Sequence, residues 1–333
     1  MKIVLVSQTN MSGVGHTTRL LQFARHFQSV FGSDNLDWIC IVPGRGIPIL
    51  KCLSLRKIFK KEFPNAHFIP MISPSIFGIL YNFISQLTLF VYLFFRYFKK
   101  KDLIFWSELT QSAWPILIYQ RWRRAPLFVN IHGTADEIIQ FRKRSGRSER
   151  LYKLDVLREE RVLANSDGLI YVSERMKTIF EDRYHLSHIQ SSVIPCCVDN
   201  KKFNWNEALR DQTRAALGWS DRFVFIYAGG TSEWQCVDEI LGLYAELTQL
   251  PESKSIKPLL YFMTWSASFK EIQLKSKKLG LNENQFKLMT ARQSEVGRYL
   301  RAADSGFILR RAVTTNQVSC PTKAGEYLLS GLP

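Results

Sequence analysis

"VLVSQTNMSGVGHTTRLL", from Val4 to Leu21, passes from a short apolar run through a glycine loop into a helical pattern. "FIYAGGTSEWQCVDEIL", from Phe225 to Leu241, repeats that order in the second half of the chain. Elsewhere, β-rich runs alternate with segments of helix length, which is typical of parallel sheets with crossover helices. We therefore predict an α/β fold of two Rossmann-like, doubly wound domains facing a cleft, with ligands at the carboxyl ends of the strands.

The segment Pro195 to Glu207, "PCCVDNKKFNWNE", has no clear periodicity and precedes a new helix and strand, so it marks the domain junction. We expect an N-terminal domain over residues 1–198 and a C-terminal domain over 199–333. The predicted strands are "KIVLVS", "DWICIV", "DLIFW", "PLFVNI", "DGLIYV", "SSVIP", "RFVFIY", "PLLYFM", "QFKLM" and "SGFIL".

The composition is that of a folded protein, because 46% of the 333 residues are apolar and 13% are aromatic. Six cysteines occur without a C-x-x-C pair or a His/Cys spacing suited to zinc, which predicts neither a disulfide framework nor a metal site and favours a reducing cytosol. The apolar start is too short for a signal peptide.

The positive charge is concentrated in the first half of the chain. Residues 1–150 carry 21 Lys and Arg against 8 Asp and Glu, a net +13 of the total +16. Such a field attracts phosphate groups of nucleic acid, anionic lipid or a substrate, and a solvated basic surface without a partner is the plainer alternative. We expect no nucleic-acid partner, because no basic motif is interleaved with aromatic residues.

One apolar segment, Ile76 to Phe98, leaves three interpretations open: a helix packed on the first sheet, an interfacial membrane helix, or a membrane span. Its polar residues disfavour a span, while the basic residues Arg96 and Lys99 to Lys101 suit anionic headgroups. We expect this segment and the basic run Arg142 to Arg147 to dock on an anionic membrane surface.

Two motifs follow strands at positions suited to ligands. "SGVGHTT", Ser12 to Thr18, opens a helix where backbone N–H groups can approach a phosphate, although a tight turn without a ligand explains it equally well. It matches neither a dinucleotide fingerprint nor a P-loop. "NIHGTADE", Asn130 to Glu137, places His132 just after a strand, where it is either a site residue or a structural histidine.

No D-x-D sequence occurs, so the usual carboxylate pair that holds Mg²⁺ on a nucleotide diphosphate is absent from the chain. A bound diphosphate would have to be met by helix ends, arginine and lysine. Arg310, after the last predicted strand, and Lys323, on the first turn of the last helix, are candidates, although each could be an ordinary surface cation.

The segment "GFILRRAVTTNQVSCPTKAGEYLLSGLP", Gly306 to Pro333, strongly resembles the donor-binding segment of family-4 retaining glycosyltransferases of the GT-B fold. "NIHGTADE", "LREERVLANSDGLIYVSERM", "VIPCCVDNKKF", "IYAGGTSEWQCVDEIL" and "LRAADSGFILR" match other family segments in the same order. The resemblance therefore covers nearly the whole chain. It implies that domain 1–198 is the acceptor-side domain and that domain 199–333 binds the nucleotide sugar.

The resemblance implies roles for eight residues. Glu326 matches the glutamate that holds the nucleotide ribose, and the backbone of Thr322 and Lys323 matches the part that faces the distal phosphate and sugar. His132 matches the histidine near the transferred sugar, and it is expected to orient that sugar and not to act as a general base. The implied catalytic residues are His132, Arg310 and Lys323, and the implied substrate-binding residues are Gly13, Gly15, Gly230, Thr322 and Glu326.

Two positions differ from the pattern of many family members. Val318 stands where they carry a second glutamate, and the loop "GGTSEWQ" lacks their arginine and lysine. Lys323 is expected to supply the missing positive charge.

The resemblance implies a glycosyltransferase that moves a sugar, with retention and without a metal or other cofactor, from a nucleotide-diphosphate sugar to a glycan or lipid-linked acceptor in polysaccharide biosynthesis. The expected location is the cytoplasm, with the inner face of the cytoplasmic membrane as a peripheral site. One alternative is a catalytically silent nucleotide-sugar or polyanion-binding protein of the same fold, and another is a dinucleotide oxidoreductase, which Thr18 disfavours. The family continues with a further strand and helices after the motif that ends here at Pro333, so the sequence predicts a second sheet short of a strand.

Overall fold

The computed structural model of the chain describes residues 1–8, 14–43, 46–73, 78–136 and 146–333. These residues form two compact units. Unit 1 contains residues 1–195 and 317–320, and unit 2 contains residues 196–316 and 321–333.

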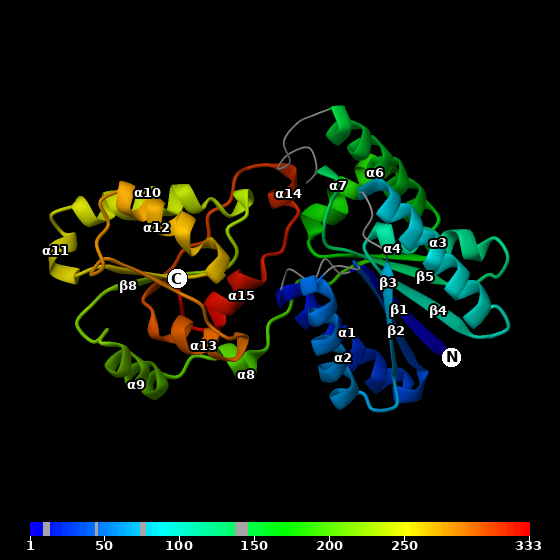
Figure 1. Cartoon of the computed structure of the whole chain (residues 1–333), viewed down its shortest axis with the longest axis horizontal. Coiled ribbons are helices and arrows are strands. Elements are labelled where there is room, and N and C mark those ends of the chain that lie inside the picture. The colour runs from blue at the N-terminus through cyan, green and yellow to red at the C-terminus, as the bar shows by residue number, and fades with distance from the viewer. Residues whose placement is uncertain (9–13, 44–45, 74–77, 137–145) are drawn as a thin grey trace. The chain divides into compact units, whose positions relative to one another are not determined.

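Unit 1 is built on a seven-stranded parallel sheet with the strand order β3-β2-β1-β4-β5-β6-β7. Helices α1 and α2 cover one face of this sheet, and α3, α4 and α6 cover the other (Figure 1). The elements of unit 1 are β1 (Lys2–Gln8), α1 (Val14–Phe31), η1 (Ser33–Asn35), β2 (Leu36–Pro43), α2 (Gly46–Glu62), β3 (His67–Ser73), α3 (Gly78–Tyr97), β4 (Leu103–Glu108), α4 (Thr110–Gln120), β5 (Leu127–Ile131), α6 (Gly146–Ala164), β6 (Gly168–Tyr171), α7 (Glu174–Tyr184) and β7 (Ser191–Val193).

Unit 2 holds a four-stranded parallel sheet with the order β10-β9-β8-β11. The elements of unit 2 are α8 (Asn200–Phe203), α9 (Glu207–Leu217), β8 (Val224–Ala228), η2 (Glu233–Gln235), α10 (Val237–Gln249), α11 (Ser253–Ile256), β9 (Leu259–Met263), η3 (Ser266–Ser268), α12 (Phe269–Lys278), β10 (Phe286–Met289), α13 (Gln293–Ala302), β11 (Ser305–Gly306), α14 (Thr314–Gln317) and α15 (Thr322–Leu329). The last residue of α14, Gln317, is the first residue of the segment 317–320 that belongs to unit 1.

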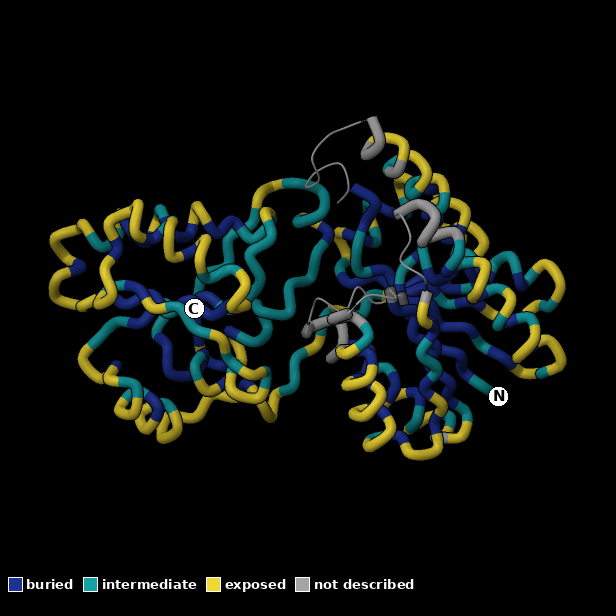
Figure 2. The backbone as a smooth tube through the Cα atoms, in the orientation of Figure 1, coloured by how far each residue is buried: buried dark blue, intermediate teal, exposed yellow. Residues whose placement is uncertain are grey.

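The central strands of both sheets are largely buried on both faces, whereas the helices are exposed on their outer sides (Figure 2). β8 shows why. Its side chains alternate, so Val224 and Ile226 pack in one core cluster with α13 and α15, while Phe225 and Tyr227 contribute to a second cluster with α10 and α12. A strand buried on both faces has a continuous apolar sequence, which is the pattern that predicts a parallel sheet with helices on either side.

Both sheets confirm the predicted α/β class. If the strands of each sheet are numbered from one in sequence order, the first four neighbouring strands of both sheets have the order 3-2-1-4. This is the arrangement of a doubly wound Rossmann-like sheet. The order therefore reverses between β1 and β4 in unit 1 and between β8 and β11 in unit 2, and ligands of such sheets bind beside the carboxyl ends of these strand pairs.

One strand of the structure, β3, was not predicted from the sequence. It lies at the edge of the first sheet, and Pro70 in its middle interrupts the apolar pattern. Proline cannot donate a ladder hydrogen bond and is tolerated on edge strands, which accounts for both its presence and the missed prediction.

The apolar segment around α3 is a helix packed on the first sheet, because Leu89, Leu93 and Tyr97 at four-residue spacing are fully buried. Within the described parts of the chain, no helix has the length and apolar character needed to cross a membrane.

A close helix contact in unit 2 provides a test of the packing. A Cβ atom added at Gly297 in α13 would lie 2.1 Å from the backbone oxygen of Lys202, whereas one added at Gly242 in α10 would meet nothing within 4 Å. Gly297→Ala should therefore lower the unfolding free energy by about 1–3 kcal/mol through overpacking. Gly242→Ala should raise it by about 0.5–1 kcal/mol through helix propensity alone. Urea unfolding of both variants measures the difference, and equal midpoints would show that α13 does not pack against this backbone.

Candidate functional site

The carboxyl ends of β8 and β11 position the first group of predicted site residues. Gly229 and Gly230 directly follow β8, and Arg310 follows β11 by four residues. The sheet order reverses between these two strands, so the loops that follow them leave the same edge on either side of a crevice. α15, which carries Thr322, Lys323 and Glu326, begins beyond these loops in the sequence and packs back onto them.

Tyr327 attaches α15 to this edge. Its buried ring packs directly against Gly306 of β11, because a Cβ atom added to this glycine would lie only 2.4 Å from the ring. Its hydroxyl oxygen accepts a hydrogen bond of 2.9 Å from the backbone N–H of Ala228, the last residue of β8. Lys323 precedes Tyr327 by one helical turn, so both side chains lie on the same face of α15 and Lys323 reaches the loop after β8.

Lys323 is held in an apolar and weakly polar environment. Its Nζ donates a hydrogen bond of 2.8 Å to Oε1 of Gln235 and lies 4.3 Å from the centre of the Tyr227 ring. Burial, with a smaller contribution from the positive charge of Arg310, lowers the pKa of Lys323 to about 7, although Glu326 acts in the opposite direction. The protonated lysine is thus poorly compensated inside unit 2.

The glycine loop after β8 leaves space for this lysine. A Cβ atom on Gly229 would lie 2.7 Å from Nζ of Lys323, so glycine is required there for the close approach. Gly230 is the glycine that the sequence analysis assigned to the site. A Cβ atom added there would have the indole nitrogen of Trp265 as its nearest neighbour, at 4.0 Å. The Gly230 carbonyl accepts a hydrogen bond from the Tyr227 hydroxyl.

Arg310 is the second half-buried cation of the site. Among the described residues its Nε is buried without a hydrogen-bond partner, and its Nη1 lies at a long 3.5 Å from the carbonyl oxygen of Trp234. Burial lowers the pKa of this guanidinium. Its neighbour Arg311, in contrast, is exposed and pairs with Glu233 and Glu239, so only Arg310 has donors available for an anion in this loop.

The first turn of α15 adds backbone donors. Thr322 is its first residue, and no side chain caps the helix start, which follows Pro321. The first N–H groups of a helix lack intrahelical partners and carry partial positive charge, which favours an anion. Glu326 follows Thr322 by one turn, and burial raises the pKa of its carboxyl group while Lys323 lowers it.

His132 lies in unit 1, directly after β5. Its Nε2 is 3.2 Å from Oε2 of Glu108, a buried carboxylate at the end of β4. Glu108 also accepts hydrogen bonds of 2.9 Å from the Trp106 indole and from the amide of Asn130, whose oxygen accepts one of 2.8 Å from Arg19. The Glu108 carboxylate therefore lies within ion-pair distance of the His132 ring, on its Nε2 side.

The later residues of "NIHGTADE" have a structural role. The Asp136 carboxylate accepts hydrogen bonds from Thr134 at 2.8 Å, from Tyr152 at 3.1 Å and from Arg183 at 2.7 Å. These contacts join the loop after β5 to α6 and α7. The motif therefore fixes the loop that carries His132.

The structure divides the predicted residues between the two units. Arg310, Lys323, Gly230, Thr322 and Glu326 come from the β8, β11 and α15 region of unit 2, and His132 belongs to unit 1. Gly15 lies in the first turn of α1, as a glycine loop before a helix predicts. Gly13 lies outside the described residues.

Sequence reasoning missed Gly229, Gln235 and Tyr227 around Lys323, and Glu108 and Asn130 around His132. Glu108 and Asn130 end neighbouring strands, so the rule that ligands lie at strand ends could have found them. Nothing local indicates that Gln235 meets Lys323, because 88 residues separate the two.

The comparisons with known proteins agree with this fold and confirm the resemblance. The model of Glycosyltransferase Family 4 matches residues 49–202. No curated protein sequence matches the chain.

Solved structures of GT-B glycosyltransferases resemble the whole chain. Anabaena HepE in complex with UDP-glucose has a TM-score of 0.68 at 16% identity, covering 100% of this chain and 79% of its own. Sucrose-phosphate synthase from Thermosynechococcus elongatus has a TM-score of 0.72 at 13% identity, with coverages of 100% and 80%. An α,α-trehalose-phosphate synthase (UDP-forming) from Burkholderia vietnamiensis has a TM-score of 0.60 at 11% identity, with coverages of 99% and 82%. The chain therefore has the GT-B fold.

The lowered pKa of Lys323 makes the stability of the ligand-free chain depend on pH. Between about 7 and the ordinary value of 10.5, the unfolded chain holds a proton that folded Lys323 has lost. The contribution of this lysine to the unfolding free energy should therefore rise with pH across this window. Lys323→Met should abolish the rise, whereas Lys278→Met, on the exposed end of α12, should retain it. Urea unfolding from pH 6.5 to 9.5 measures both, and parallel curves for the parent chain and Lys323→Met would contradict the buried, weakly basic lysine.

Proposed function

We propose that the chain is a glycosyltransferase that binds the diphosphate of a nucleotide-sugar donor through Lys323, Arg310 and the start of α15. The observation that carries this proposal is the pair of half-buried cations at the carboxyl edge of the second sheet, whose positive charge is poorly compensated by carboxylates. Structural similarity to HepE with bound UDP and with bound UDP-glucose supports the choice of a nucleotide sugar over other diphosphates.

The mechanism we propose is electrostatic. When the bond between the sugar and the diphosphate breaks, negative charge builds up on the leaving phosphate, and preorganised cations in a desolvated site stabilise that charge most strongly. Lys323 and Arg310 supply the cations, and the N-terminus of α15 supplies partial positive charge. These groups perform the role that a metal ion has elsewhere, so we propose metal-independent transfer. We further propose that the acceptor attacks from the leaving-group face, which retains the anomeric configuration.

The other site residues receive matching roles. The Glu326 carboxylate suits the two ribose hydroxyls, because it can accept two hydrogen bonds. His132, oriented by Glu108, would orient the transferred sugar through a hydrogen bond near the reacting carbon. The histidine is not proposed as a general base.

The acceptor class and the location remain proposals of the same kind. We propose a glycan or lipid-linked acceptor in polysaccharide biosynthesis, reached from the cytoplasm at the inner face of the membrane. The +13 charge of residues 1–150 supports an anionic surface near the acceptor-side domain.

A catalytically silent nucleotide-sugar or polyanion-binding protein of the same fold is the second candidate, and Val318 favours it. This residue stands where many family members carry a second glutamate, and its side chain is buried while its carbonyl accepts a hydrogen bond of 2.8 Å from Ser173. No carboxylate is therefore available at this position to hold sugar hydroxyls.

Removal of the Lys323 ammonium should weaken diphosphate binding. Lys323→Ala should reduce the affinity for UDP by about 1.5–3 kcal/mol, the range of a hydrogen bond to a charged group, and should leave the affinity for uridine nearly unchanged. Calorimetric titration measures both ligands. Lys278→Ala, on the exposed end of α12, is the matched control. Retention of full UDP affinity in Lys323→Ala would exclude this lysine as the diphosphate ligand.

Donor use should survive chelation of divalent metals. Excess EDTA should change neither UDP affinity nor the transfer of radiolabelled glucose from UDP-glucose to a membrane extract by more than about twofold, because protein cations meet the diphosphate charge. A large loss of both would sink metal independence. Tight UDP binding without transfer to any acceptor fraction would favour the silent binding protein.

A further inference from the structure

A basic cavity lies at the amino-terminal edge of the first sheet, where β4 and β5 begin. Its volume is about 270 Å³, and its lining combines the turn between α3 and β4 with the turn between α4 and β5. His132 and Glu108 follow the other ends of these strands, so this cavity is separate from the candidate site. The lining residues are Lys100, Lys101, Asp102, Leu103, Trp122, Arg123 and Arg124.

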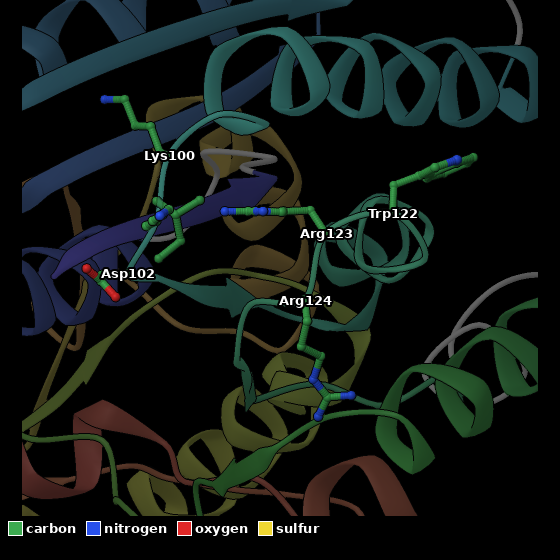
Figure 3. Close-up of a pocket in the computed structure, with 7 residues that line it drawn as sticks. Lys100, Asp102, Trp122, Arg123 and Arg124 are labelled. Atoms are coloured by element: carbon green, nitrogen blue, oxygen red, sulfur yellow. The ribbon is translucent and has the colours of Figure 1, made fainter.

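Positive charge dominates this lining, with four cations against the single carboxylate of Asp102. Arg124 pairs with Asp167 at 2.7 Å, and Nζ of Lys100 lies 5.7 Å from the centre of the Tyr97 ring. Burial and the positive charges of Arg96 and Lys2 lower the pKa of Lys100, as expected where like charges gather. Figure 3 shows the Arg123 side chain extending toward the Lys100 to Asp102 turn, so cations from both turns line the same cavity.

An apolar surface adjoins the cavity. Leu87, Val91 and Phe95 recur at four-residue spacing on α3 and are exposed, Phe95 to 83%. Phe98, directly after the helix, lies on the same face and is also exposed. These four residues form a stripe opposite the buried side of α3.

Trp122 lines the cavity and packs against the part of α3 beside the stripe. Its ring centre lies 5.4 Å from that of Phe90 and 6.3 Å from that of Phe94, both on α3, yet its side chain is 56% exposed. Figure 3 shows it directed away from Arg123, at the end of α4. An amphipathic tryptophan between an apolar stripe and a cationic cavity is the arrangement of a membrane interface.

We propose that this cavity and the stripe on α3 bind the surface of an anionic phospholipid bilayer, with a lipid phosphate in the cavity and the side chains of Leu87, Val91, Phe95 and Phe98 in the headgroup region. Charge complementarity favours a membrane over a protein as the binding partner. A protein could cover the apolar stripe, but an apolar stripe beside a cationic cavity matches a surface that presents phosphate groups and acyl chains together. The site differs from the one that the sequence indicates, because it uses the end of α4 in addition to the α3 segment. It does not rest on the proposed transferase activity.

Vesicle sedimentation of the full chain tests the site. The parent chain should bind vesicles of phosphatidylglycerol and phosphatidylcholine, but bind pure phosphatidylcholine weakly. Lys101→Gln with Arg123→Gln should reduce binding to the anionic vesicles about 25-fold, since each cation near such a surface contributes about fivefold. The control Lys277→Gln with Lys278→Gln changes the net charge equally on an exposed part of unit 2 and should reduce binding less than threefold.

The apolar half of the site needs its own variant. Phe95→Ser should reduce vesicle binding about tenfold or more through lost burial of the ring. Leu274→Ser, at an exposed leucine of α12, should leave it unchanged. Equal binding of the parent chain and both docking variants, or equal losses in the docking and control variants, would overturn the proposal.

Two further measurements separate the competing explanations. The first measurement adds inorganic phosphate or, as a control, chloride at equal ionic strength to the vesicle-bound chain. If phosphate displaces the chain and chloride does not, the cavity binds a soluble phosphate compound and the membrane assignment is overturned. The docking variants should retain the UDP affinity of the parent chain without vesicles. Loss of UDP binding in them would show a misfolded chain or a shared site and would also overturn the proposal.

Discussion

The hydrogen bond from the Ala228 amide to the Tyr327 hydroxyl sets the geometry on which the second-unit site depends. It ties α15 to the end of β8, while the ring against Gly306 ties the same helix to β11. These are the two strands between which the sheet order reverses. Lys323, one turn earlier on α15, is consequently held over Tyr227, and the apolar contacts of Tyr327 offset the cost of burying a cation there.

The cations that contribute to the net charge of +16 include two groups in physically different environments, one at the unit 2 site and one around the cavity of the first sheet. Arg310 and Lys323 are half-buried, so their interaction with an anion is strengthened by the lower local dielectric and is weakened less by salt. Lys101 and Arg124 around the cavity of the first sheet are exposed, so an anion there is attracted more weakly and in a salt-dependent way. Total charge alone could not distinguish a desolvated ligand site from an open docking surface, although both contribute to the same number.

The sequence was sufficient for the parts of the fold that depend on local patterns. Apolar runs with glycine loops predicted β1, β8 and the helices after them, whereas Pro70 concealed β3. Contacts between distant segments were not predictable in this way. The need for glycine at position 229 arises only because α15 brings Lys323 against it, and Arg123 and Lys100 line one cavity only because β4 and β5 are neighbours in the sheet. Resemblance to a family pointed to Arg310 and Lys323 as site candidates, and tertiary structure shows the neighbours of these two cations, Trp234 and Gln235.

The burial of Lys323 has a consequence for selectivity. In the ligand-free chain its pKa is about 7, so near neutral pH a substantial fraction of the lysine is uncharged. A bound diphosphate would favour the protonated form and raise that pKa, so binding above pH 7 would take up a proton. A nucleoside without phosphates provides no such compensation. The desolvation cost is already met in the folded chain, which leaves the site preorganised for a highly charged ligand and poorly suited to a neutral one.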